Sequence, residues 1–195
     1  MEECELPCDR TSVDEQFKKI MNDLVKPYPG FENLIKNIEV EMSYTMPGKG
    51  IVRGVYDYES GTLKVFCIRY KVCVETLIHE ILHSNRKTKR RGIFDEGLTE
   101  LFTLYYLKKF LPQCIDHRLT DALCMINKEY EYYVRLWGSI ALEVGIERLW
   151  KYYTRGNDEL LDEIETKENL FESEKLVQQK LKIKIYDLID ILDKL

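Results

Sequence analysis

The spacing of hydrophobic residues changes near Val72 and divides the chain into a strand-rich part and a helical part. Before Val72, apolar and polar positions alternate, as is typical of half-buried strands. We expect strands at residues 38–46, 51–58 and 62–70. After it, an apolar stripe from Val74 to Leu82 predicts a helix, and a further helical run covers about residues 95–111 before Pro112.

Helices are also expected on both sides of these segments. Ser12 to Glu15 has capping-box spacing and precedes an amphipathic run through Val25. Residues 31–37 form a short second helix in this interpretation. Residues 118–195 are mostly helical by pattern, with breaks near Trp137-Gly138, near residues 155–157 and near Lys167. We expect the last apolar run, residues 176–195, to dock on the domain, although it could instead form a dimer or cover a cleft.

A sheet followed by helices predicts an α+β fold, because alternating βαβ units are absent from the pattern. The 195 residues fit a single domain. Within residues 1–195, residues 38–111 would hold the sheet and the two helical runs that begin at Val74 and near residue 95. Residues 118–195 would form a helical C-terminal subdomain.

Composition and charge narrow the function classes. The chain is 45% hydrophobic and 32% charged, which is ordinary for a globular protein. A net charge of −5 argues against nucleic-acid binding, and the basic residues 86–91 are interpreted as a solvated loop. No apolar run approaches the ~20 residues of a membrane span. The acidic N-terminus does not resemble a signal peptide, so a cytoplasmic location is expected.

Six cysteines are expected to be free thiols in that reducing compartment. A zinc site built from the first four of them is an alternative, although their spacing is looser than that of zinc knuckles. The thiolate of Cys4 or Cys8 could also occupy the open position of a metal site and keep an enzyme latent. The cysteines are Cys4, Cys8, Cys67, Cys73, Cys114 and Cys124.

Residues 79–83 read His-Glu-Ile-Leu-His and carry the strongest chemical signal of the chain. Residues four apart on a helix share one face, so His79 and His83 can bind one metal ion. The alternative is a pair of packed histidines. Glu80, between them, is the candidate general base, which would take a proton from a metal-activated water. The donor types favour Zn²⁺.

A second acidic segment, Asp-Glu-Gly-Leu-Thr-Glu, begins at Asp95 and supplies a candidate third ligand, Glu96. Asp95 would face about a hundred degrees away on the same helix. Glu100 lies one turn after Glu96 and could hydrogen-bond a histidine ligand from behind, or could simply face solvent. Gly97 is costly inside a helix, and a close approach of the two metal-binding helices would explain it.

These two segments resemble the gluzincin metallopeptidases, the zincins whose third zinc ligand is a glutamate. The motif Asn-Glu-x-x-Ser-Asp of thermolysin-like members is matched by Asp95, Glu96, Thr99 and Glu100. The Asn-Glu-Gly run of related aminopeptidases is matched by Asp95, Glu96 and Gly97. The resemblance implies a zincin-like fold, zinc on His79, His83 and Glu96, and peptide or protein substrates. It also implies an edge strand that pairs with extended substrate, for which residues 62–70 are the candidate.

The chain departs from the large gluzincins because it has no Gly-Ala-Met-Glu-Asn run and no identifiable oxyanion-binding residue. We therefore expect a small zinc peptidase, with a catalytically weak zincin-fold peptide-binding or regulatory module as the alternative. A metal-free helical interaction protein is a second alternative. The sequence does not define the oligomeric state. Candidates for the oxyanion role are His117, Tyr130, Tyr132, Tyr133, Tyr152 and Tyr153.

Overall fold

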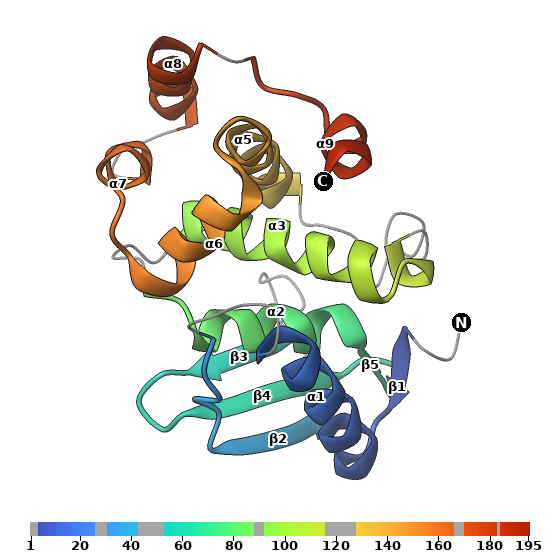
Figure 1. Cartoon of the computed structure of the whole chain (residues 1–195). Coiled ribbons are helices and arrows are strands. Elements are labelled where there is room, and N and C mark those ends of the chain that lie inside the picture. Colours follow the sequence, from blue (N-terminus) through green and yellow to red (C-terminus); the bar gives the residue numbers. More distant parts are fainter. Residues whose placement is uncertain are drawn as a thin grey trace. The chain divides into compact units, whose positions relative to one another are not determined.

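The computed structural model describes residues 4–25, 31–42, 53–87, 92–115, 128–165, 170–182 and 184–195. The chain divides into two compact units. The first comprises residues 1–85 and 109–125, and the second comprises residues 86–108 and 126–195. Small sheets and many helices confirm the α+β class (Figure 1). Among the described residues, no helix has the length and apolar character needed to cross a membrane.

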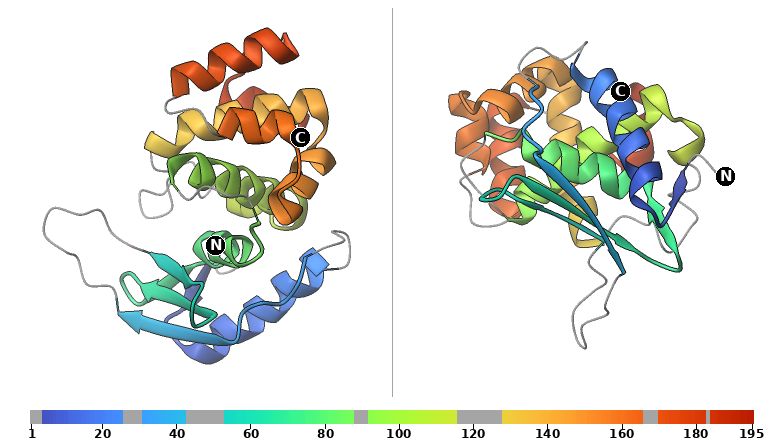
Figure 2. Two further views of the ribbon diagram at one scale, coloured as in Figure 1. Left: turned by 90° about the vertical axis from the view of Figure 1, so that its left-hand side faces the viewer. Right: turned by 90° about the horizontal axis from the view of Figure 1, so that it is seen from below.

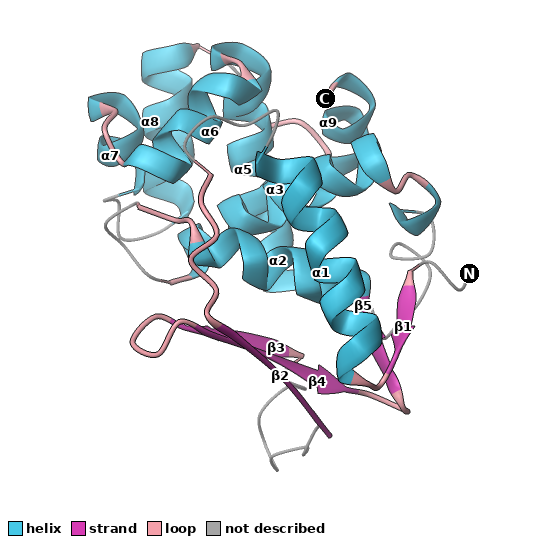
Figure 3. Cartoon of the chain, turned by 60° about the horizontal axis from the view of Figure 1, so that its bottom comes forward, coloured by secondary structure: helices cyan, strands magenta, loops and turns pink. Residues whose placement is uncertain are grey.

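A three-stranded sheet forms the base of the first unit, in the order β2-β4-β3. β2 (Asn37–Met42) runs parallel to β4 (Thr62–Cys67), and β3 (Gly54–Asp57) runs antiparallel to it. Leu63, Val65 and Cys67 alternate along β4 and are almost fully buried. Helices α1 (Arg10–Val25) and α2 (Val74–Ser84) lie on one side of this sheet (Figure 3). The sheet is therefore a platform for α2, the helix with both histidines.

A second, two-stranded sheet precedes α2 directly and was not expected from the sequence. β1 (Glu5–Pro7) pairs antiparallel with β5 (Lys71–Cys73). The amide of Val74, the first residue of α2, donates to the carbonyl of Cys4 at 3.0 Å. The N-terminal segment thus fixes the start of the histidine helix. Strands this short have too few residues to show the alternation on which sequence interpretation relies.

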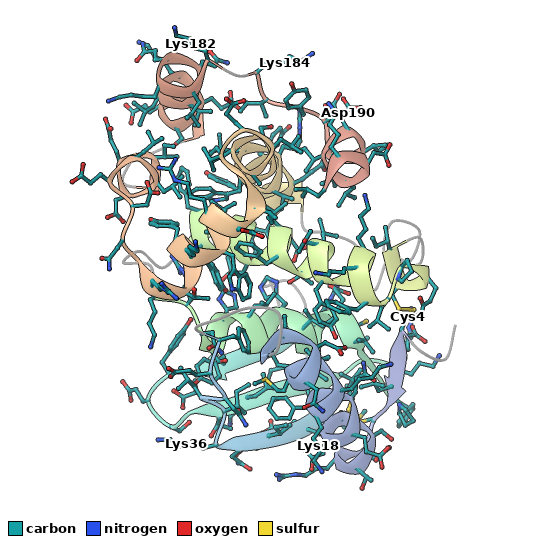
Figure 4. The ribbon with its side chains drawn as sticks, viewed as in Figure 1. Cys4, Lys18, Lys36, Lys182, Lys184 and Asp190 are labelled. Atoms are coloured by element: carbon teal, nitrogen blue, oxygen red, sulfur yellow. A yellow bond between two sulfur atoms is a disulfide. The ribbon has the colours of Figure 1, made fainter. Side chains whose placement is uncertain are left out.

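The expectation of free thiols is wrong, because the described cysteines form disulfides. Cys4 bonds to Cys114, Cys8 bonds to Cys67, and Cys73 is also disulfide-bonded. Figure 4 labels Cys4 at the N-terminal strand. These bonds leave no thiolates for the four-cysteine zinc site, nor for a latch formed by Cys4 or Cys8. Cys124 lies outside the described residues.

The first helix begins earlier than the capping box at Ser12 predicts. α1 starts at Arg10, and the carboxylate of Asp9 accepts hydrogen bonds from the Ser12 amide (2.9 Å) and hydroxyl (2.8 Å). Asp9 is therefore the capping residue, because a carboxylate three residues before an amide makes the same bond as a serine hydroxyl. The helix expected at residues 31–37 is also wrong, since residues 31–36 form no helix or strand and Asn37 begins β2.

The second unit is built on α3 (Ile93–Phe110, of which residues 93–108 belong here) and a group of later helices. The longest of these helices, α5, packs against α6, α8 and α9 (Figure 2). The break expected near Arg155 is confirmed, because α6 ends there, while the break near Lys167 lies outside the described residues. The helices are α5 (Lys128–Val144), α6 (Ile146–Arg155), α7 (Glu159–Glu165), α8 (Leu170–Leu181) and α9 (Leu188–Lys194).

The break expected at Trp137-Gly138 is wrong, because α5 continues through both residues. A Cβ atom at Gly138 would lie 2.5 Å from Cγ2 of Ile191 in α9. Gly138 therefore makes room for a neighbouring helix. Arg135 of α5 also contacts the Asp187 carboxylate at 2.9 Å. Because Ile191 is fully buried, the expected docking of the C-terminal run is confirmed.

The turn between β3 and β4 depends on an ionised carboxylate. The Ser60 hydroxyl donates to Asp57 at 2.7 Å and the Glu59 amide does so at 3.0 Å, and these bonds lower the pKa of Asp57 from its ordinary 3.8. A lowered folded-state pKa contributes stability above the ordinary pKa, and this contribution is lost as the pH falls through the folded value. Asp57→Asn should therefore be less stable than wild type at pH 7 but equally stable well below pH 3.8.

Chemical denaturation at several pH values measures this difference. Asp193→Asn, on the exposed side of α9, is the control and should match the wild type throughout. A deficit of Asp57→Asn that stays constant down to strongly acidic pH would contradict the role of the ionised carboxylate.

Candidate metal centre

The two histidines lie on one side of α2, as their spacing predicts. Val74, Leu77, Ile78, Ile81 and Leu82 form the fully buried stripe of this helix. His79 is half-buried and His83 is buried, with their Nε2 atoms 3.0 Å apart. Two nitrogens on one tetrahedral zinc ion, each about 2.05 Å from it, are about 3.3 Å apart. The pair is therefore arranged closely enough to bind one ion.

Contacts at the C-terminal end of α2 hold the backbone that carries these histidines. The Tyr58 hydroxyl donates to the His83 carbonyl at 3.1 Å. Asn85 caps the helix, and its side-chain oxygen accepts the Glu32 amide at 2.6 Å. Sequence reasoning missed Tyr58, Asn85 and Glu32, and no local pattern identifies them because each acts across a tertiary contact.

Glu80 lies against the edge strand of the sheet. Its side chain is buried (9% exposed), and a Cβ atom on Gly54 of β3 would lie 2.7 Å from Glu80 Cγ. Only glycine leaves room for the glutamate at this point. The candidate general base is therefore positioned by the backbone of β3.

Glu96 joins the two histidines in a group that could hold a metal ion. One ligand atom from each of His79, His83 and Glu96 lies within 4.8 Å of the other two. Asp95 instead pairs with Arg86, which agrees with the expected difference in direction between the two neighbours. Because Arg86 is buried, its interpretation as part of a solvated loop is wrong. Two imidazoles and one carboxylate form a donor set that zinc accepts.

Packing within the second unit fixes the first two turns of α3, where Glu96 lies. The Trp137 indole donates to the Phe94 carbonyl at 2.9 Å. The hydroxyls of Thr99 and Tyr153 lie 2.9 Å apart in a buried hydrogen bond. Both contacts come from helices in the C-terminal part of the chain. The position of Glu96 thus depends on residues far from it in sequence.

The reason for Gly97 differs from the one expected from the sequence. A Cβ atom here would lie 2.2 Å from Cβ of Tyr133 and about 3 Å from its backbone, so the close neighbour is α5. Backbone cannot rotate away as a flexible side chain can. The helix that approaches is therefore a packing partner of α3 within the second unit.

Gly97→Ala should destabilise the protein by about 1–3 kcal/mol, because overpacking against backbone exceeds the gain in helix propensity. Thermal unfolding of the metal-free protein measures the loss. Glu143→Ala, on the exposed side of α5, is the control and should unfold like the wild type. Stabilisation by Gly97→Ala would show that α5 does not approach α3 this closely.

Glu100 is buried (3% exposed), so the solvent-facing alternative is wrong. A buried carboxylate needs polar or charged neighbours to offset its desolvation. Its support of a histidine ligand stays a prediction.

Most of the tyrosines considered for oxyanion binding have other roles. Tyr153 is fully buried beside Thr99, and the hydroxyl of the buried Tyr152 donates to Asp162 at 3.2 Å. Tyr133 packs edge-on against Phe94. Tyr130 and Tyr132 stay candidates for oxyanion binding, and His117 lies outside the described residues.

No protein-family model, curated protein or solved structure matches this chain. The case for a function therefore rests on the chemistry of the site itself.

Proposed function

We propose that the chain is a small zinc-dependent peptidase of the gluzincin type, with His79, His83 and Glu96 as zinc ligands. The observation that carries the proposal is the grouping of these three side chains, since each offers a donor atom within 4.8 Å of the others. The ligands come from two helical segments whose motifs resemble those of gluzincins, although the interval from His83 to Glu96 is shorter than in many large members and suits a compact one. Further support comes from Glu80, which lies between the two histidines in the sequence of α2.

His79, His83 and Glu96 would hold a zinc ion through two imidazoles and one carboxylate, and the bound ion would supply a net positive charge that favours deprotonation of water. Glu80 then acts as general base: it accepts the proton from water and donates it to the amine that leaves when the peptide bond breaks. The neighbouring backbone at Gly54 restricts where the Glu80 side chain can go. Glu100, buried on α3, is proposed to orient a histidine ligand.

The substrate-pairing strand in this proposal is β3. The expected strand, residues 62–70, cannot serve because β4 is central and is paired on both sides. Within the described residues, β3 pairs only with β4. The Phe66 amide donates to the Arg53 carbonyl, so the alternation of an antiparallel ladder directs the peptide groups of Gly54 and Tyr56 away from β4. These groups are available to an extended peptide beside Glu80.

Incubation of the zinc-loaded protein with a broad peptide library tests this function. The proposal predicts cleavage that stops when a chelator removes the metal and returns with added zinc. Peptides methylated on alternate backbone amides should be cleaved more slowly than their unmethylated forms, since β-pairing needs those amides. A library that remains intact would contradict the peptidase.

The alternative proposal, a catalytically weak zincin-fold module that binds or regulates peptides, is favoured by one observation. Tyr152 and Tyr153 are buried and hydrogen-bonded, which leaves few oxyanion candidates among the described residues. Such a module would bind members of the library without cleaving them. Equilibrium binding to zinc-loaded protein distinguishes it from the peptidase.

We also infer that the protein works in an oxidising compartment. Disulfides form and persist in such compartments and are rare in a reducing cytoplasm. Five of the six cysteines are disulfide-bonded in the described residues. This inference replaces the cytoplasmic location expected from the N-terminal sequence. Localisation of a tagged protein that places it in a reducing compartment, with its thiols free, would contradict it.

A further inference from the structure

A buried ion pair joins two residues that stand close in sequence to the proposed zinc ligands. Arg86 follows His83 by three positions, and Asp95 directly precedes Glu96. The Arg86 guanidinium contacts the Asp95 carboxylate, and the two side chains are only 2% and 5% exposed. Burial removes both charges from water, so apolar residues of similar volume often give equal or greater stability. Stability alone therefore does not account for this pair.

The pair acts on the helical turn that carries Glu96. Asp95 and Glu96 lie in the first turn of α3, where the Glu96 amide donates to the Gly92 carbonyl at 3.0 Å. Successive residues of a helix point about 100° apart, so fixing the direction of Asp95 also fixes the direction of Glu96. A guanidinium is planar and always charged, and it holds a carboxylate with stricter geometry than an apolar contact does.

We propose that Arg86 and Asp95 are a positioning pair that directs the Glu96 carboxylate toward the metal. This inference rests on the zinc site proposed above. It assigns Asp95 a role different from that of its neighbour: Glu96 binds the metal, while Asp95 sets the rotation of the turn. Another contact of this turn, the hydrogen bond from the Trp137 indole to the Phe94 carbonyl, holds the turn in place. That bond involves no charged group that would set the rotation of the turn about the helix axis.

The variant that tests the pair is the double substitution Arg86→Met with Asp95→Leu. It replaces both charges with apolar groups and leaves neither charge buried alone. The metal-free double variant should therefore melt close to the wild type. Zinc affinity, measured by competition with a chromophoric chelator, should fall about 10–100-fold, the usual effect of losing a group that orients a metal ligand. The visible spectrum of the cobalt-loaded protein should change as well.

A matched control uses an ion pair of the same unit that lies outside the metal centre. Arg148 contacts the Asp158 carboxylate at 2.7 Å and 3.1 Å. Arg148→Met should leave zinc affinity and the cobalt spectrum unchanged. This control separates loss of any salt bridge in the second unit from loss of the one beside Glu96.

Arg86→Lys covers the case in which the double variant does not fold. Lysine keeps the positive charge but loses the planar fork, so the protein should fold with a several-fold lower zinc affinity and a shifted cobalt spectrum. Wild-type zinc affinity and spectrum in a folded double variant, or in Arg86→Lys, would overturn the positioning role alone. Absence of zinc binding by the wild type would overturn the metal site as well, so the two failures are distinguishable.

Discussion

Replacing Glu80 with glutamine should reduce peptidase activity by about 10²–10⁴-fold while zinc stays bound, because general acid–base catalysis contributes rate factors of this size. Glutamine has nearly the same shape, but it cannot accept a proton from water at neutral pH. Glu80 is not one of the three grouped ligands, so the metal should remain. Steady-state cleavage of a library-derived peptide, together with the zinc content of the same sample, measures both effects.

The control for Glu80 is Glu75→Gln, which removes another carboxylate from α2. Glu75 lies in the first turn of this helix, before the histidines, and contacts Arg53 at 3.9 Å. It should retain most of the wild-type activity. Unchanged activity in a zinc-loaded Glu80→Gln protein would refute the general-base role and leave the metal site intact.

Loss of the Cys4–Cys114 disulfide should lower the free energy of unfolding by about 2–5 kcal/mol, the usual range for a native disulfide. The two cysteines are 110 residues apart in sequence, so the bond restricts the unfolded chain strongly. Both are also buried. For a protein of this length, the midpoint of thermal unfolding should fall by about 5–20 °C. The variant Cys4→Ser with Cys114→Ser measures this change.

Two further measurements make this prediction sharp. Alkylation of unfolded, unreduced protein should leave Cys4, Cys8, Cys67 and Cys114 unmodified. Removal of the Cys8–Cys67 bond should also destabilise the protein, since it closes a separation of 59 residues. Alkylation of these four cysteines without a reductant would contradict the disulfides and restore the expectation of free thiols.

The sequence predicted the elements whose signals are local. A helical stripe from Val74 to Leu82 and the spacing of His79 and His83 predict one face of one helix, and α2 has this form. The disulfides were not predictable, because pairing depends on which cysteines the fold brings together. β4 was mistaken for an edge strand because alternation does not reveal which strands flank it. Gly138 was mistaken for a helix break, whereas its lack of a side chain makes room for Ile191, which is distant in sequence.

In the candidate site, too, local spacing predicted some residues, while those that act through tertiary contacts could not be predicted. The local spacing of the two motifs predicted that His79, His83 and Glu96 form a group and that Asp95 points in a different direction. The residues that hold them in place were not visible, since Tyr58, Asn85 and Trp137 act through tertiary hydrogen bonds. Gly97 was noticed as an unusual helix residue, but its neighbour Tyr133 could be identified only from the structure.

The metal content of protein purified without a histidine tag is the most direct test of the central claim. Elemental mass spectrometry should find about one zinc per chain in the wild type and a large loss in His83→Ala, because a single ligand removed from a three-residue site weakens binding strongly. His117→Ala removes the remaining histidine and should keep its zinc. A wild-type protein that contains no zinc, and takes up none from micromolar solution, would contradict the metal centre and the peptidase built on it.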